Sequence, residues 1–554
     1  MNTMSGGSIF LSLMKDEGVT HLFGNPGTTE LPIMHALAEH PDLTYVLGLQ
    51  EAVVLAMADG YARGSGRLTA CNVHVAPGLG NAMGSLFNAR WSGSPVIVSA
   101  GQQEQGHGLT EPLLYGPLVE MASPLVKWAC EVTRTEDLPR IVRRAAKVAM
   151  TPPTGPVFLS LPGDVLNAEV GVELGQATRV DVDVRPTDEA LATLATRLLR
   201  ANNPVIVCGS ELRSDDALAE AAELAELLGA AVYSQSVTSG AFFPTEHSCF
   251  VAGLTRSQPQ VRDTLAPYDL MVALGGDVLR MSVYSEVEPL PEGLAVVQIG
   301  QDDWEIAKNY AVEHAVRAQL KVTLSALAGA VRTQMNDANR EAAAARLEAL
   351  ATRNWTTSRA TLAAQLTASD AGVPLNPDRV MLELVSSLPR DAIVVEEGLL
   401  STRQLPALLP LRERHDFFGL DSGGIGFAIA GAVGVSLANP DRRVVAVIGD
   451  GSAMYSIQAL WSAAHMQAPI TYVIANNSSY RILKERLLAF HDNDQFTGMN
   501  MREPPIEFAN LARSMGLWAE RVTNIDELQE VLRAAHAHQG ASLVEVMVAD
   551  GFEG

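Results

Sequence analysis

Two short polar segments in the last third of the chain combine residue types that could hold a charged ligand. Residues 449–451 read Gly-Asp-Gly and follow an apolar run at 444–448, and residues 475–479 read Ala-Asn-Asn-Ser-Ser and follow a run at 471–474. If both runs are parallel strands, the two segments emerge at the carboxyl edge of one sheet, where open α/β sheets bind ligands. The glycines let the backbone approach a phosphate, and the following helix presents free N–H groups.

The side chains of Asp450 and Asn477 in these segments offer hard oxygen atoms. Such oxygens suit a Mg²⁺ ion that bridges a diphosphate. A Gly-Asp-Gly triplet alone is often only a turn, but the asparagine pair at the next predicted strand end favours a ligand site. The sequence therefore predicts a magnesium–diphosphate site in the last third.

Short apolar runs alternate with helical patterns along the whole chain, and they could supply the scaffold for this site. The runs lie at 45–48, 96–98, 157–161, 205–207, 270–274, 296–299, 393–395, 444–448, 471–474 and 543–546. Stretches between them, such as 215–228 and 525–536, have helical periodicity. This alternation predicts α/β units with parallel sheets that helices cover on both faces.

Two breaks in this pattern divide the chain. One is a polar, unpatterned stretch that ends near residue 186, and the other is an Ala/Arg/Glu-rich helical run. They predict an N-terminal domain at 1–180, a middle domain at 185–335, a helical connector at 336–369 and a C-terminal domain at 370–554. Because the three domains are similar in length, we expect three similar-sized open parallel-sheet domains.

The composition excludes several classes of partner. The 554 residues include 63 Asp and Glu against 40 Lys and Arg, a net charge of −23. A protein that holds nucleic acid needs a basic face, and an acidic surface does not favour an anionic membrane. The N-terminus has an amphipathic helical pattern without a basic region, and the four cysteines form no CxxC pair. We expect a soluble, cytoplasmic protein with no nucleic-acid or membrane partner.

The spacing of the two polar segments is also that of a known motif. Gly449-Asp450-Gly451, followed after 24 residues by Asn476-Asn477, resembles the cofactor-binding motif of the thiamine diphosphate-dependent decarboxylases and carboligases. The resemblance implies thiamine diphosphate and Mg²⁺ as cofactors. It implies that the metal ligands are Asp450, Asn477 and the backbone carbonyl of Ser479.

The resemblance covers essentially the whole chain and is greatest to the benzoylformate decarboxylase branch of that family. Matching segments include 23–31, 59–62, 72–74, 80–84, 100–103, 125–128, 155–157, 243–250, 423–428 and 450–456. By resemblance Gly423 offers its carbonyl to the 4′-amino group of the cofactor, and Ile425 props the cofactor into its V shape. The resemblance extends cofactor binding to Gly449, Gly451, Ser452, Ala453, Tyr455, Asn477, Tyr480 and Ile482.

The first third supplies the implied catalytic residues. Glu51 follows the predicted strand at 45–48, where the family has a glutamate that exchanges a proton with N1′ of the aminopyrimidine ring. A glutamate in the first turn of a helix is the alternative interpretation for this residue. His74 resembles a histidine that handles protons near the substrate carbonyl, and Thr28 stands where a serine binds the substrate carboxylate.

The chain departs from the benzoylformate decarboxylases at two places. Ser282 replaces their second catalytic histidine, so another proton donor is needed to release aldehyde. His107 is the candidate, with an exposed loop histidine as the alternative. After the metal ligands, the segment that begins at Tyr480 is more like acetolactate synthase-like proteins, and Ile482 fills space that an aryl ring needs.

The resemblance implies a lyase that converts a 2-oxo acid, benzoylformate-like or branched, into an aldehyde and CO₂, with carboligase activity as a further reaction. An acetolactate synthase-like or acyloin-forming carboligase is the alternative. A third hypothesis is a protein whose middle domain binds FAD or another nucleotide and which has lost catalysis, although intact Glu51, Asp450 and Asn477 favour an enzyme. The family builds each site from two chains, so we expect a homodimer at least, and a homotetramer.

Overall fold

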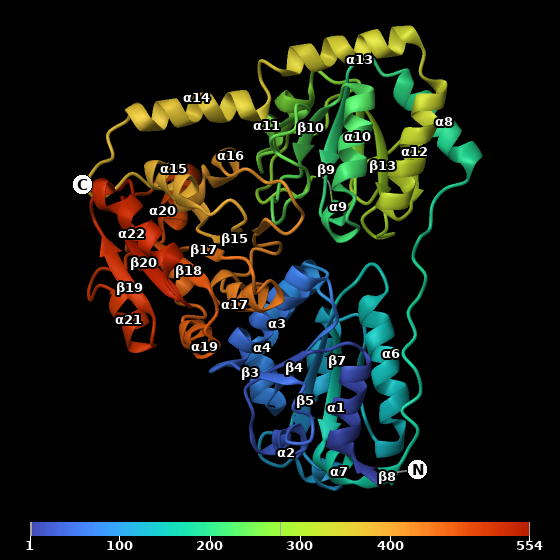
Figure 1. Ribbon diagram of the computed structural model, residues 1–554, viewed down its shortest axis with the longest axis vertical. Helices are drawn as coiled ribbons and strands as arrows, with labels where there is room; N and C mark the ends of the chain where they lie inside the picture. Colours follow the sequence, from blue (N-terminus) through green and yellow to red (C-terminus); the bar gives the residue numbers. More distant parts are fainter. Residues whose placement is uncertain (1–2, 278, 553–554) are drawn as a thin grey trace. The chain divides into compact units, whose positions relative to one another are not determined.

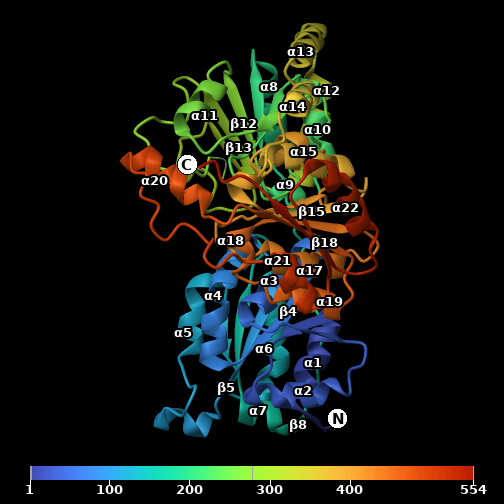
Figure 2. The same cartoon turned by 90° about the vertical axis from the view of Figure 1, so that its left-hand side faces the viewer.

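The computed structural model describes residues 3–277 and 279–552 and divides into two compact units. One unit comprises residues up to 180 together with 371–403 and 420 onward. The other comprises 181–370 and 404–419. The first and last thirds of the sequence therefore fold as one body (Figures 1 and 2). The candidate residues of both thirds lie in that body.

The first third forms a six-stranded sheet of order β3-β2-β4-β5-β7-β6, in which all pairings are parallel. Helices α1 (Gly6–Asp16) and α6 (Leu138–Met150) lie on one face, and α3 (Glu51–Ser65) and α4 (Val75–Trp91) on the other (Figure 1). Both faces are covered, which explains why β4, β5 and β7 are buried throughout. The strands are β2 (His21–Gly24), β3 (Thr44–Leu47), β4 (Thr69–Val73), β5 (Val96–Gln102), β6 (Ala129–Glu131) and β7 (Val157–Pro162).

The last third forms a second sheet, whose five strands within this unit have the order β15-β17-β18-β20-β19 with parallel pairings. These strands are β15 (Ile393–Glu397), β17 (Val444–Gly449), β18 (Ile470–Asn476), β19 (Trp518–Val522) and β20 (Ser542–Met547). Helix α17 (Ala428–Ala438), whose residues are almost all buried, precedes β17, and the four-residue helix α18 (Asp450–Ala453) follows it. The central strands of this sheet, β17 and β18, end at the two polar segments that the sequence singled out.

The other unit holds a third sheet, six-stranded and parallel, of order β11-β10-β9-β12-β13-β14. Its strands are β9 (Pro204–Cys208), β10 (Ala231–Ser234), β11 (Phe250–Gly253), β12 (Leu270–Leu274), β13 (Ala295–Gly300) and β14 (His314–Arg317). Helices α13 (Asp337–Leu350) and α14 (Trp355–Ala368) follow it. Three parallel sheets flanked by helices confirm the predicted fold class.

Helix α3 packs against α17 without space for side chains at the crossing (Figures 1 and 2). A Cβ on Gly60 would overlap the carbonyl oxygen of Gly431, and a Cβ on Gly434 would overlap that of Met57. Only glycine allows the two backbones to approach so closely. The contact fixes the start of α3, at Glu51, relative to the loop that leads into α17.

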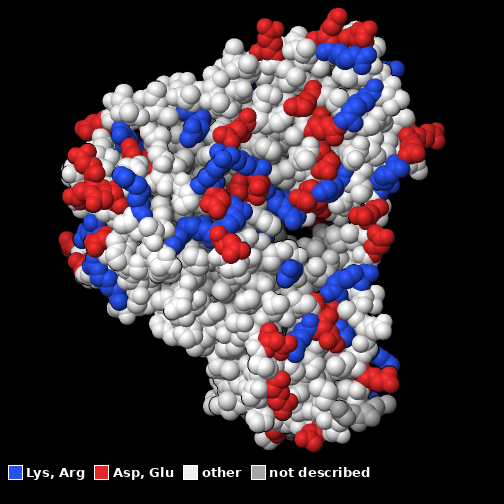
Figure 3. All heavy atoms as spheres, in the orientation of Figure 1, with Lys and Arg blue, Asp and Glu red and all other residues white. Residues whose placement is uncertain are grey.

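The surface and the cysteines agree with the composition. Acidic and basic side chains are interspersed over much of the face in Figure 3, as expected of a solvated surface, whereas its lower left carries almost none. All four cysteines are free thiols, and three of them are buried. Among residues 3–277 and 279–552, no helix combines the length and apolar character that a bilayer crossing requires.

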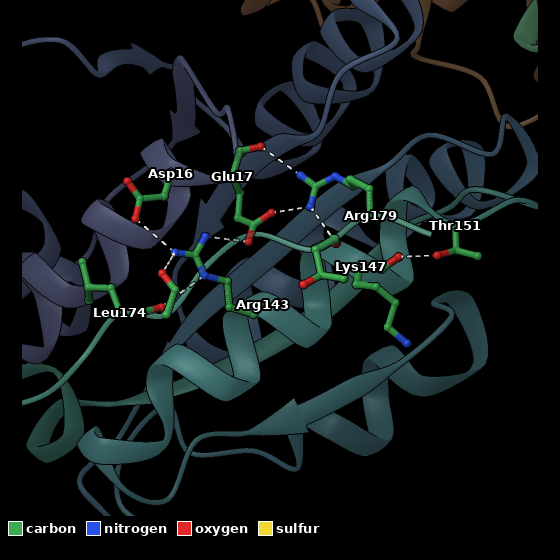
Figure 4. A network of polar contacts seen from close by, with 9 residues as sticks. Asp16, Glu17, Arg143, Lys147, Thr151, Leu174 and Arg179 are labelled. Atoms are coloured by element: carbon green, nitrogen blue, oxygen red, sulfur yellow. Dashed lines mark hydrogen bonds and ion pairs between the residues drawn. The ribbon is translucent and has the colours of Figure 1, made fainter. Parts of the chain in front are cut away.

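A buried carboxylate ties the segment after the first sheet back to α1 (Figure 4). The Glu17 side chain has no exposed surface and accepts hydrogen bonds from Arg143 at 2.7 Å and Arg179 at 2.5 Å. Arg143 also donates to Asp16 at 3.0 Å and to the carbonyl of Leu174 at 3.3 Å. The network holds residues 174–179 on the first third.

We predict that Glu17→Ala destabilises the protein by about 3 kcal/mol, because it leaves two guanidinium groups beside an empty buried position. Urea denaturation followed by circular dichroism measures the change. Glu136→Ala is the control, because Glu136 faces Arg134 in an exposed ion pair 3.6 Å long and should hardly change the unfolding midpoint. Equal midpoints for the Glu17 and Glu136 variants would contradict the prediction.

Candidate cofactor and catalytic site

The predicted metal ligands lie at the carboxyl ends of β17 and β18, and Asp450 is the most informative of them. Its side chain is buried, and Oδ1 accepts a hydrogen bond from the Gly451 N–H at 2.9 Å. Oδ2 is buried without a hydrogen-bond partner among the described residues, and so is the hydroxyl of Ser479. Burial raises the pKa of the Asp450 carboxyl to about 6. An unpartnered buried carboxylate oxygen fits a cation.

The turn after β18 shapes the rest of this donor set. The Asn477 side-chain oxygen accepts from the Ser479 N–H at 2.9 Å, and Ser478 has a left-handed backbone with φ +52°. The side-chain amide of Asn476 is fixed by a hydrogen bond of 2.7 Å that it donates to the buried carboxylate of Glu545. Sequence reasoning missed Glu545, because its partner lies 69 residues away.

The predicted metal ligands at this site all offer oxygen atoms. No group of three or more His, Cys, Asp or Glu that could hold a metal occurs in residues 3–277 and 279–552. A carboxylate, an amide oxygen and a backbone carbonyl suit Mg²⁺ better than a transition metal.

A cavity of about 330 Å³ opens beside these residues and contains most of the predicted cofactor positions. It is lined by Gly398, Leu399, Leu400, Ser401, Ile425, Gly449, Asp450, Gly451, Ser452, Tyr455, Asn477, Ser479, Tyr480, Arg481, Ile482 and Leu483. Gly423 and Ala453 were also predicted to bind cofactor but do not line it. The stretch 398–401 was not anticipated, since nothing in its composition marks it as a ligand wall.

The structure brings two of the implied catalytic residues of the first third close together. Glu51 is the first residue of α3 and His74 directly precedes α4. A Cβ built on Gly78, in the first turn of α4, would lie 3.2 Å from Glu51 Oε1 and 3.4 Å from His74 Cβ. Glu51 is buried and accepts a hydrogen bond from Asn81 at 3.0 Å. The Glu51 carboxyl and the Cβ of His74 therefore lie beside the same glycine, Gly78.

Glu30 orients His74 and was not assigned a role from the sequence. Its buried carboxylate accepts from the N–H groups of Gly27 and Gly101, each at 2.9 Å, and from the Thr29 hydroxyl at 2.8 Å. His74 Nδ1 lies 2.7 Å from the same carboxylate. A carboxylate in this position makes Nδ1 the donor, which leaves Nε2 of His74 for proton exchange.

The other two implied catalytic residues lie elsewhere on the first third. Thr28 and His107 are both exposed and line a larger cavity of about 910 Å³, which Glu51 and His74 do not line. His107 lies in the short 3-10 turn Gln105–Thr110. Ser282 is exposed and belongs to the other unit.

The two halves of the site are separate within one chain. Every described residue that lines the cavity beside Asp450 comes from the segment 398–483. None of the predicted catalytic residues Glu51, His74 and Thr28 is among them. Within one copy of the chain, the predicted metal ligands and the predicted acid–base residues thus do not share this cavity.

Comparison with known families identifies all three parts of the chain. Residues 4–112 match the N-terminal binding domain of thiamine pyrophosphate enzymes, residues 191–327 match their central domain, and residues 405–546 match their C-terminal binding domain.

Similar proteins span nearly the full length. A benzoylformate decarboxylase of Pseudomonas aeruginosa is 35% identical over 96% of this chain and 97% of its own. A putative acetolactate synthase large subunit of Mycobacterium tuberculosis is 29% identical over 98% and 99%, respectively. The structure of a 4-hydroxybenzoylformate decarboxylase from Rhodococcus jostii superposes with a TM-score of 0.88 at 31% identity and covers 99% of both chains.

These matches confirm the predicted resemblance and the predicted cofactor, thiamine diphosphate, which this family uses with Mg²⁺ as its usual metal partner. The chain belongs to the thiamine pyrophosphate enzyme family.

Proposed function

We propose that this chain is a thiamine diphosphate- and Mg²⁺-dependent lyase that decarboxylates a 2-oxo acid to an aldehyde and CO₂. The observation that carries the proposal is the buried, unpartnered carboxylate oxygen of Asp450 in the cavity at the ends of β17 and β18. Asp450, Asn477 and the carbonyl of Ser479 would hold Mg²⁺, and the cavity would hold the diphosphate. When bound, thiamine diphosphate supplies a nucleophilic carbon and an electron sink for the loss of CO₂.

The remaining roles belong to the first third. Glu51 holds and exchanges a proton at N1′ of the aminopyrimidine, protected from water by its burial. His74 exchanges a proton at the substrate carbonyl through Nε2, with Glu30 fixing its ring. Thr28 binds the substrate carboxylate through its hydroxyl, and His107 is the candidate donor for aldehyde release.

These roles require two copies of the chain, since the two halves of the site do not share a cavity in one copy. We propose a homodimer in which the first third of one copy completes the last third of the other, with a homotetramer as the larger assembly. In this arrangement the segments 1–180, 185–335 and 370–554 are the pyrimidine-binding, middle and diphosphate-binding domains, with 336–369 as connector. We place the enzyme in the cytoplasm.

We propose that the apolar side chains of the cofactor cavity also border the substrate and favour an aliphatic substrate side chain. Leu399, Leu400 and Ile482 line the cavity and present branched apolar groups. An aryl ring needs the volume that Ile482 occupies. We therefore favour a branched 2-oxo acid over benzoylformate itself. The second candidate function is a carboligase, because Ser282 cannot replace a histidine as proton donor and slow aldehyde release favours capture by a second aldehyde.

A screen of 2-oxo acids tests the function. With thiamine diphosphate and Mg²⁺ present, we expect CO₂ release from branched 2-oxo acids at a higher kcat/KM than from benzoylformate. Product analysis separates free aldehyde from the hydroxyketone that ligation yields. Absence of CO₂ from every 2-oxo acid, in a protein that binds the cofactor, would overturn both candidate functions.

Glu51→Gln tests the acid–base half. The amide keeps the shape of the side chain but cannot exchange a proton, so we expect kcat to fall by about 10²–10⁴-fold while cofactor still binds. Glu189→Gln is the matched control, because Glu189 also lies in the first turn of a helix but is exposed. If Glu51→Gln turns over like the control, Glu51 is only a helix-start residue.

Metal removal tests the proposed metal-binding half of the site. Treatment with a chelator should abolish activity, and added Mg²⁺ should restore it. Asn477→Ala removes one oxygen ligand, so we expect the Mg²⁺ concentration for half-maximal activity to rise by about tenfold or more. Asn202→Ala, an exposed residue of the other unit, should leave that concentration unchanged. An unchanged Mg²⁺ requirement in Asn477→Ala refutes its assignment as ligand.

A further inference from the structure

Two consecutive glutamates end β15, and each one holds a different wall of the cofactor cavity. Glu396 accepts hydrogen bonds from the Gly398 N–H at 2.7 Å and the Thr402 hydroxyl at 2.5 Å. These contacts fix the stretch 398–401, which lines the cavity. Glu397 points to the opposite side, as successive residues of a strand must, and contacts the segment that carries Ile425.

Glu397 is almost completely buried, and its two oxygens are used separately. Oε1 accepts from the Gly426 N–H at 2.6 Å, and Oε2 accepts from the Ala428 N–H at 2.7 Å. Ala428 is the first residue of α17, and the residue before it, Phe427, has no side-chain cap. The carboxylate therefore serves as the missing cap from a strand residue 31 positions away from Ala428.

Both backbone polar groups of Gly426, its N–H and its carbonyl, are hydrogen-bonded. Its N–H donates to Glu397, and its carbonyl accepts from the Ser456 hydroxyl at 2.7 Å. Its backbone is left-handed, with φ +111°. The preceding Gly424 carbonyl accepts from Asn88 at 2.7 Å. Ile425 thus lies between two anchored peptides, and its position in the cavity depends on both.

The chemistry of this contact requires a carboxylate rather than any small polar group. Two N–H donors that face different directions need two acceptor atoms on one planar group, and only Asp and Glu offer two without a competing donor. Burial raises the pKa of the Glu397 carboxyl to about 7, while the hydrogen bonds from Ala428 and Gly426 act in the opposite direction. Burial of the Glu397 carboxylate costs solvation free energy, and its hydrogen bonds to the backbone of the loop offset that cost.

We propose that Glu397 is a positioning residue for the cofactor: its carboxylate clamps residues 426–428 so that Ile425 presses on the ring part of thiamine diphosphate. This inference rests on the proposed function, since it assigns Ile425 to the cofactor. The diphosphate end is held independently, by Asp450, Asn477 and the glycines after β17. Loss of the clamp therefore affects the ring part of the cofactor and spares its diphosphate.

Calorimetry tests this division: the full-length apoprotein, in buffer that contains Mg²⁺, is titrated with thiamine diphosphate and, separately, with inorganic diphosphate. For Glu397→Gln we expect the Kd for thiamine diphosphate to rise at least about tenfold, while the Kd for inorganic diphosphate stays within about twofold of the unmutated protein. The amide presents an N–H to one of the two backbone donors, so the clamp opens. Faster hydrogen exchange at residues 425–430 of the apoprotein should accompany the loss.

Glu211→Gln provides the matched control. Glu211 is a half-buried carboxylate of the other unit whose pKa desolvation raises to about 8, and it accepts a hydrogen bond from the backbone N–H of Gln301 at 2.7 Å. Its loss should leave both affinities unchanged. An equal loss of affinity for inorganic diphosphate and for the whole cofactor in Glu397→Gln means a general structural role and overturns the proposal.

Two further outcomes separate this inference from the proposed function. Unaltered affinity for thiamine diphosphate in Glu397→Gln overturns the clamp alone and leaves the function standing. Failure of the unmutated protein to bind thiamine diphosphate overturns the proposed function, and the clamp with it.

Discussion

The close crossing of α3 and α17 is the constraint on which the candidate site depends. Glycine on both helices lets the backbones touch, and this contact joins the first and last thirds into one body. Each helix begins at a segment with a proposed role, since α3 starts with Glu51 and α17 follows the loop of Ile425. A side chain at the crossing would push the helices apart and shift both segments at once.

Buried carboxylates hold several of the turns in this unit. Glu30, Glu397 and Glu545 are each buried, and each accepts hydrogen bonds from groups distant in sequence. Ionised carboxylates accept bonds without donating any, so they can organise several N–H groups in a turn. Asp450 differs from the three, because one of its oxygens has no partner among the described residues. The three with full partners shape the protein, and the one without is suited to a ligand.

The sequence allowed the local parts of this arrangement to be predicted. The apolar runs are contiguous patterns that sufficed for the fold class, and the resemblance of the Gly-Asp-Gly turn and the asparagine pair to a family motif gave the cofactor and most of the residues of the cavity wall. Glu30, Glu545 and Glu397 could not be predicted in the same way, because their contacts span 71, 69 and 31 residues. A buried glutamate and an exposed one have the same letter, and only the tertiary structure distinguishes them.

The proposed homodimer completes the site without disturbing the crossing of α3 and α17. In one chain the cavity beside Asp450 is lined only by residues of 398–483, and Glu51 lies at the start of a helix fixed by the glycine crossing. Bringing Glu51 into that cavity inside one unit would require α3 to move relative to α17, against their close backbone contact. Docking two identical bodies keeps every such contact, and it generates two complete sites at once, because an isologous interface pairs each half with its complement.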